Sequence, residues 1–149
     1  MSCCAFLALA LAFAPAPFPK PGKPAAGQDD LKALQGTWST VRRTSGGREV
    51  KSAGEVTVVI AGSTLKYLVN GMVRTEWAIT LDATKDPRVL DRTRIGGATK
   101  GVVLRGIYRL DGDTLTICYR QRVGEAERPT SFAGSGIGVW VHVMKRQNP

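Results

Sequence analysis

From residue 56 onward the chain alternates apolar and polar side chains with a period of two, and this alternation constrains its fold most. Successive side chains of a β-strand point to opposite faces, so the period is typical of half-buried strands. The clearest alternating segments are residues 56–60, 65–69, 73–81, 102–110 and 114–121. Because no long helical pattern separates these segments, the sequence predicts an all-β fold.

Turn signals join neighbouring segments into hairpins. Asn70-Gly71 is typical of a two-residue hairpin turn, because both residues tolerate positive φ. Asp111-Gly112-Asp113 indicates a second hairpin. Further strands near 37–43, 88–94 and 138–146 bring the total to about eight, which predicts an antiparallel up-and-down barrel. An open sandwich is the alternative.

A glycine-x-tryptophan triplet, Gly36-Thr37-Trp38, opens the strand region. Glycine lets a strand bend sharply at its entry, and a tryptophan two residues later can plug the floor of a barrel. We expect Arg146, near the end of the last strand, to lie across the Trp38 ring at this closed end. Before the triplet, an Asp29 cap and two leucines on one face predict one short helical turn.

The glycine-x-tryptophan triplet with a basic last strand resembles lipocalin-like barrels. Four further segments resemble a family of uncharacterised planctomycete proteins in order and spacing, over nearly all of residues 31–146. These segments are Leu34–Trp38, Leu81–Pro87, Gly106–Cys118 and Arg128–Phe132. The resemblance implies a lipocalin-like fold and export from the cell. It brings no established ligand, catalytic residue or partner.

The first 28 residues do not look like part of the barrel. Residues 3–14 are apolar, too short to span a bilayer, and typical of a signal-peptide core, so we assign 1–14 to a signal peptide. Five of the eight prolines lie between Pro15 and Pro24, which indicates an extended linker over 15–28. The barrel domain is assigned to 29–149, and we expect the protein to be exported to the periplasm or the extracellular space.

The barrel domain is basic. It carries 19 of the 21 Lys and Arg and all 12 Asp and Glu, a net charge of +7. Such a charge attracts anions, anionic surfaces or nucleic acid without selecting among them. Exposed aromatic residues that could stack on bases are not evident between the arginines, so we do not expect a nucleic-acid partner. We expect the strand arginines to form solvated outer faces.

Strand alternation also assigns an interior. The residues expected to face inward are Trp38, Val56, Val58, Ile60, Leu65, Tyr67, Val73, Trp77, Ile79, Leu104, Tyr108, Leu115, Ile117 and Tyr119. In the last strand, Val139, Val141 and Val143 compete with Trp140, His142 and Met144. We favour the valines inward, because β-branched residues fit a packed sheet.

The inward aromatic residues predict a small-molecule pocket, since they combine apolar surface with polar tips. We predict ligand contacts from Tyr67, Trp77, Tyr108 and Tyr119, with Arg128 reaching an acidic head group from a loop. Such a pocket requires a cavity of about 300 Å³ or more. Gly106 leaves space beside Tyr108 in this interpretation. A solid core made by the same residues is the alternative.

The sequence offers no catalytic constellation. His142 is the only histidine and has no acidic residue near it in the chain, which argues against a nucleophilic triad or a metal site. Cys118 is expected to be a partly buried strand cysteine, although nearby arginines could make it reactive. Asp111 and Asp113 are assigned to a turn. We therefore predict no metal, no cofactor and no enzymatic activity.

The sequence thus predicts an exported, non-enzymatic binding protein for a small apolar or amphipathic ligand, with an acidic head group as one option. The alternative is a filled barrel that contacts proteins or an anionic envelope component through its basic surface.

Overall fold

The computed structural model describes residues 26–121 and 127–148. The predicted signal peptide and linker residues 15–25 lie outside the described residues. Within the described residues, no helix has the length and apolar character needed to cross a membrane.

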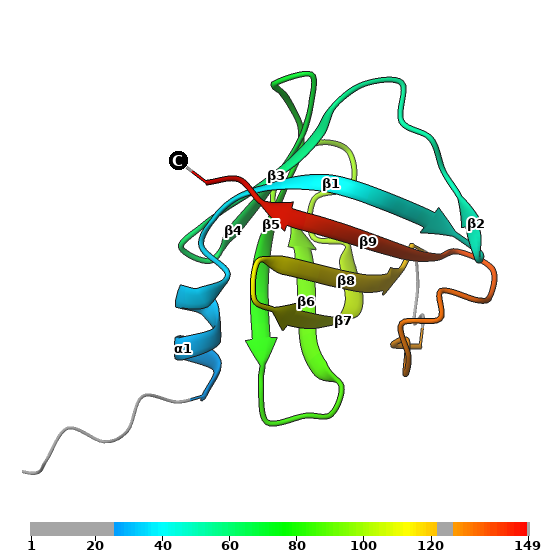
Figure 1. The fold of residues 1–149 in the computed structure, drawn as a ribbon. Helices are drawn as coiled ribbons and strands as arrows, with labels where there is room; N and C mark the ends of the chain where they lie inside the picture. Colours follow the sequence, from blue (N-terminus) through cyan, green and yellow to red (C-terminus); the bar gives the residue numbers. More distant parts are fainter. Residues whose placement is uncertain (1–25, 122–126, 149) are drawn as a thin grey trace, which may run out of the picture.

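The described chain consists of one short helix followed by antiparallel strands (Figure 1). The elements are α1 (Ala26–Ala33), β1 (Gly36–Ser45), β2 (Arg48–Glu49), β3 (Val56–Ala61), β4 (Thr64–Val69), β5 (Met72–Asp82), β6 (Arg88–Arg94), β7 (Val103–Asp111), β8 (Thr114–Arg120) and β9 (Val139–Arg146). The helix begins at Ala26, earlier than the Asp29 cap expected from the sequence. Asp29 therefore lies in the first turn of α1.

The strands form a closed eight-stranded barrel with β2 as an extra strand. From β3 to β9 each strand pairs with the next, and β1 pairs with both β3 and β9. Figure 1 shows β1 and β9 running side by side, which closes the sheet. The predicted up-and-down barrel is thereby confirmed, and it is consistent with a lipocalin-like fold. Both predicted hairpin turns are present, with positive φ at Asn70, Gly71 and Gly112.

One end of the barrel is closed by α1 and the start of β1. Trp38 is fully buried, and its indole N–H donates to the Leu34 carbonyl at 3.0 Å. The Arg146 guanidinium carbon lies 4.2 Å from the centroid of the Trp38 ring, and its nitrogens donate to the carbonyls of Ala33 and Gln35 at 2.7 Å. Gly36 has a φ of +118° and packs against Arg146. The predicted contact between Trp38 and Arg146 is confirmed.

Outside β9, the core follows the predicted inward face with one exception, Val73. Val73 is 49% exposed, although simple alternation along β5 places it inside. The register between β4 and β5 shifts after Tyr67, so that Tyr67 pairs with Thr75 while Leu68 pairs with Val73. This bulge leaves Arg74 unpaired and turns Val73 to the outer face.

In β9 the expected orientation is wrong. Met144 belongs to the barrel core, and Trp140 and His142 also point inward. Val139 and Val141 are buried on the outer wall, where they pack with Ile107, Cys118 and Phe132. Phe132 belongs to the segment before β9. Because this segment covers the outer side of β8 and β9, the outward-facing residues there can be apolar.

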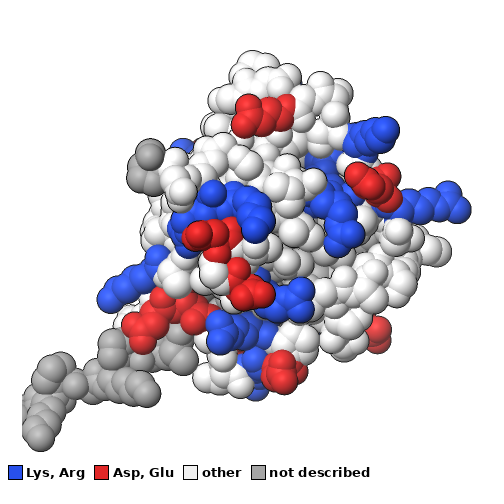
Figure 2. All heavy atoms as spheres, viewed as in Figure 1, with Lys and Arg blue, Asp and Glu red and all other residues white. Residues whose placement is uncertain are grey.

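On the face of the molecule drawn in Figure 2, basic and acidic side chains are interspersed. In the face shown in Figure 2, groups of Lys and Arg lie next to Asp and Glu, without a continuous basic stripe. Among the described residues, ion pairs at the surface include Lys66–Glu76 at 3.0 Å and Arg88–Asp30 at 2.9 Å.

Candidate functional site

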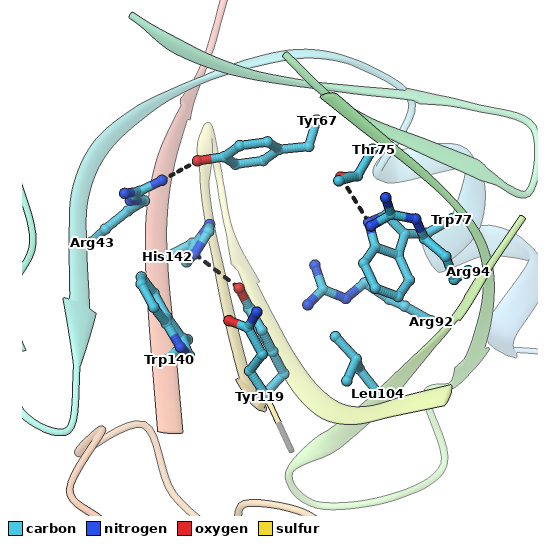
Figure 3. Close-up of a pocket in the computed structure, with 11 residues that line it drawn as sticks. Arg43, Tyr67, Thr75, Trp77, Arg92, Arg94, Leu104, Tyr119, Trp140 and His142 are labelled. Carbon is cyan, nitrogen blue, oxygen red and sulfur yellow. Dashed lines mark hydrogen bonds between the residues drawn. The ribbon is translucent and has the colours of Figure 1, made fainter. Parts of the chain in front are cut away.

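A pocket of about 200 Å³ lies inside the barrel at the end away from α1 (Figure 3). Its walls come from the halves of β1, β4, β5, β6, β7, β8 and β9 that lie farthest from the helix. The lining residues are Arg43, Tyr67, Thr75, Trp77, Arg92, Arg94, Leu104, Tyr119, Gln121, Trp140 and His142.

The structure brings together three of the five predicted ligand contacts. Tyr67, Trp77 and Tyr119 line the pocket. Tyr108 lies instead at the closed end, where its hydroxyl donates to Asp30, and burial together with this hydrogen bond raises the pKa of Tyr108. Arg128 lies on the outer wall and is not part of the pocket lining.

Arg128 is engaged in a structural ion pair. Its guanidinium bonds both carboxylate oxygens of Asp91, one of them at 3.0 Å, and donates to the Gly106 carbonyl at 2.8 Å. This contact fastens the segment before β9 to strands β6 and β7. The sequence prediction grouped Arg128 with the inward aromatic residues, and the structure does not.

The cavity is smaller than the roughly 300 Å³ expected for a ligand of ordinary drug size. Towards α1 the interior is filled by the main core cluster, which includes Trp38, Tyr108, Leu115 and Met144. Gly106 leaves no empty space, since a Cβ there would lie 2.8 Å from the Cys118 carbonyl and 2.9 Å from that of Leu90. The barrel is therefore solid at the helix end and hollow at the other.

Three arginines line the pocket, which corrects the expectation that the strand arginines face outward. Arg92 is buried and only 7% exposed, whereas Arg43 and Arg94 are half-buried. Aromatic faces hold all three: the Arg92 guanidinium carbon is 3.8 Å from the Tyr119 centroid, that of Arg43 is 5.6 Å from Trp140, and that of Arg94 is 5.0 Å from Trp77. None of the described residues that line the pocket is acidic.

A bulge in β1 explains why sequence alternation missed Arg43. Thr40 pairs with Met144, whereas Arg42 pairs with Val143 and Arg43 with His142. The extra residue, Val41, shifts the alternation so that Arg43 joins the inward face that begins at Trp38. For Arg92 and Arg94 the sequence did contain a signal of an inward side chain. Both lie an even number of residues after the buried Leu90, so strand alternation puts all three on the same face.

The polar tips of the pocket are partly paired with one another. Arg43 donates to the Tyr67 hydroxyl, and the Trp77 indole N–H donates to Thr75 Oγ1 at 3.0 Å. The Tyr119 hydroxyl and His142 Nε2 lie 3.2 Å apart. Burial, with Arg92 and Arg43 adding repulsion, lowers the pKa of His142 from 6.5 to about 3. His142 is therefore neutral near pH 7 and a weak base.

The other chemical candidates from the sequence are structural. Cys118 lies in β8 as expected but is fully buried on the outer wall rather than partly buried, and burial raises the pKa of its thiol to about 11. Asp113 forms an ion pair with Arg146 at 3.4 Å beside the β7–β8 turn. Across the two described ranges, no three His, Cys, Asp or Glu side chains gather as metal ligands would.

Searches against protein-family models, curated proteins and solved structures find no match to this chain. The resemblance to planctomycete proteins therefore stays a prediction. The site itself is a small concave surface with aromatic walls and cationic groups.

Proposed function

We propose that this chain is an exported, non-enzymatic binding protein that holds a small amphipathic ligand in the open half of its barrel. The observation that carries the proposal is the division of the interior. Hydrophobic side chains fill the helix end, whereas the other end retains a cavity of about 200 Å³. Close packing is the rule in protein interiors, so a retained concave pocket is a feature to which a function can be assigned.

The lining of the pocket supports binding of an amphipathic molecule. Trp77, Trp140 and Leu104 supply apolar walls, and Tyr119 adds a ring with a polar tip. Aromatic walls give contact area, and a few polar groups orient the ligand. The small volume favours a ligand below drug size, or one whose remainder extends out of the barrel.

The same residues support binding without catalysis. General acid–base chemistry works best with a group whose pKa lies near the working pH. The pKa of His142, near 3, is far from that range, and no acidic residue lines the described part of the pocket.

A thermal-shift panel tests this proposal. Benzoate, benzamide and benzylamine share one ring and differ in charge. A ligand that binds only the folded state stabilises it, so the melting temperature rises with the logarithm of the ligand concentration. We expect at least one of the three to do so, and we expect Leu104→Trp, which fills the pocket with a larger ring, to abolish the shift.

If no compound in such a panel stabilises the protein, the pocket proposal fails. Interaction of a protein or an anionic envelope component with the outer surface would then be the better account. The interspersed charges in Figure 2 give that alternative less support than a continuous basic patch would.

A further inference from the structure

Arg92 carries a buried charge for which the described residues provide no partner. Its side chain is 7% exposed, and its Nε is buried without a hydrogen-bond partner. The ion pairs found in the described residues leave Arg92 out, since they involve Lys66, Arg88, Arg128 and Arg146. Buried charges in proteins are normally paired and hydrogen-bonded, because desolvation is costly.

Two aromatic rings hold the Arg92 guanidinium while leaving its edge free. Its central carbon lies 3.8 Å from the Tyr119 centroid and 5.1 Å from the Trp77 centroid. In Figure 3 the guanidinium points into the pocket between these rings. Contact over a ring occupies the flat face of a guanidinium, whereas its N–H groups lie in the plane and form a fork that matches a carboxylate.

A second cationic side chain faces the pocket from β1. Arg43 packs over Trp140 and Tyr67, and its buried Nε also lacks a hydrogen-bond partner. Arg94 reaches the pocket from the end of β6. Three cations with no acidic residue among the described lining make this pocket electropositive, and a low-dielectric cavity strengthens such a field.

We infer that the ligand is a small carboxylate with a flat apolar body, whose head group bonds the free edge of Arg92 while its body packs against the aromatic walls. This inference rests on the proposed function and specifies its ligand class. The paired oxygens of a carboxylate match the guanidinium fork. A bare inorganic anion would satisfy Arg92 but leave the walls formed by Trp77, Trp140 and Leu104 uncovered.

Calorimetric titration of the purified protein with benzoate, benzamide and inorganic phosphate tests the inference. Benzamide has nearly the shape of benzoate but no charge. We expect benzoate to bind at least about tenfold more tightly than benzamide or phosphate, because only benzoate offers both a charged planar head and a ring.

Substitutions locate the head group. Arg92→Met keeps the length of the side chain and removes the charge, so we expect a loss of about tenfold or more in benzoate affinity with little change for benzamide. Arg92→Lys keeps a charge without the fork and should give a smaller loss. Arg105→Met is the matched control, because Arg105 is exposed on β7, and it should leave benzoate affinity within about twofold.

The outcomes that overturn the inference can be told apart from those that overturn the proposed function. Equal binding of benzoate and benzamide, or unchanged benzoate affinity in Arg92→Met, removes the anionic assignment while the pocket remains a binding site. Phosphate binding as tight as benzoate assigns the pocket to inorganic anions. If Arg92→Met does not fold, Arg43→Met and Arg92→Lys carry the test, and unchanged benzoate affinity in both overturns the inference. Failure of every compound in the thermal-shift panel overturns the proposed function as well.

Discussion

At the scale of single residues, Arg92 has opposing effects on stability. Its contacts with Tyr119 and Trp77 are favourable by about 0.5–2 kcal/mol each where the rings are desolvated. Against this stands the cost of burying a charge without an acidic partner in the described residues, which amounts to several kcal/mol per ion. The balance depends on whether an anion is present.

We therefore predict that Arg92→Met raises the free energy of unfolding of the ligand-free protein by about 1–3 kcal/mol, as replacement of poorly compensated buried charges by apolar groups often does. Urea denaturation of both proteins measures this difference. Arg105→Met again serves as the control. A lower stability of Arg92→Met would mean that Arg92 serves the fold itself.

His142 gives the site a pH dependence whose direction follows from its burial. The pKa of His142 is about 3 in the folded protein, against an unperturbed value of 6.5. Between pH 3 and pH 6.5 the histidine is therefore protonated in the unfolded chain and neutral in the folded one. The groups that face His142 are Tyr119, Tyr67, Trp140, Arg43 and Arg92. Stability is full above pH 6.5 and falls as the pH is lowered towards 3.

From this we predict that the wild type loses about 1.6 kcal/mol more stability than His142→Gln when the pH falls from 6.5 to about 5, because the slope rises from half its limit at pH 6.5 towards roughly 1.4 kcal/mol per pH unit. Denaturation curves at several pH values provide the comparison. Taking the difference between the two proteins cancels carboxylates that titrate in both. Parallel pH profiles would show that His142 is not buried in its neutral form.

At the scale of strands and turns, the alternation of apolar and polar residues predicts where the strands lie better than it predicts which side chains of a strand point into the barrel. The hairpin at Asn70-Gly71 and the Gly36–Trp38 entry follow from local backbone chemistry, so the sequence sufficed for them. The bulges beside Val41 and Arg74 depend on how neighbouring strands pair, and one extra residue reverses every later side chain of the strand. Arg43 and Val73 were misplaced for this reason.

The outer wall shows a second limit of alternation. Val139 and Val141 are as buried as core residues, but they are covered by Phe132 from a segment outside the barrel. A strand that is apolar on both faces carries no signal that distinguishes inside from outside. Of the site, the aromatic residues Tyr67, Trp77 and Tyr119 could be predicted. The inward face of Arg92 and Arg94 was also predictable from their even spacing to Leu90, whereas that of Arg43 was not, because it depends on the β1 bulge.

Gly106 illustrates how closely β7 approaches its neighbours. A Cβ at this position would lie within 3 Å of two backbone carbonyls, and backbone cannot move aside as a flexible side chain can. We predict that Gly106→Ala costs about 1–3 kcal/mol, as overpacking of a core does. Thermal or urea unfolding measures it, with Gly112→Asn in an open turn as a control for glycine loss. If Gly106→Ala left the free energy of unfolding unchanged, β6 and β8 would be able to move apart enough to accommodate the methyl group.

At the scale of the whole molecule, the two ends of the barrel have different roles. The α1 end is closed by Trp38, Arg146 and their backbone contacts, whereas the other end contains the cavity and the arginines. A closed barrel has no free sheet edge along its long strands, so it can keep a rigid wall around an unfilled interior.

The proposed export belongs to this scale, because it rests on residues outside the barrel. We predict that protein isolated from its native cell lacks the apolar leader of residues 3–14 and leaves Cys118 as its only cysteine. Intact-mass measurement decides this. A mass equal to that of the chain from Met1, in protein recovered from the cytoplasm, would contradict it.

The most direct test of ligand binding in the open end uses the three tryptophans of the chain as reporters. Trp77 and Trp140 line the pocket, whereas Trp38 is buried at the closed end with its indole bonded to Leu34. In a nitrogen-15 NMR titration with benzoate, we predict that the indole signals of Trp77 and Trp140 shift and saturate together while that of Trp38 stays in place. Three unmoved signals, or a shift largest at Trp38, would contradict the account.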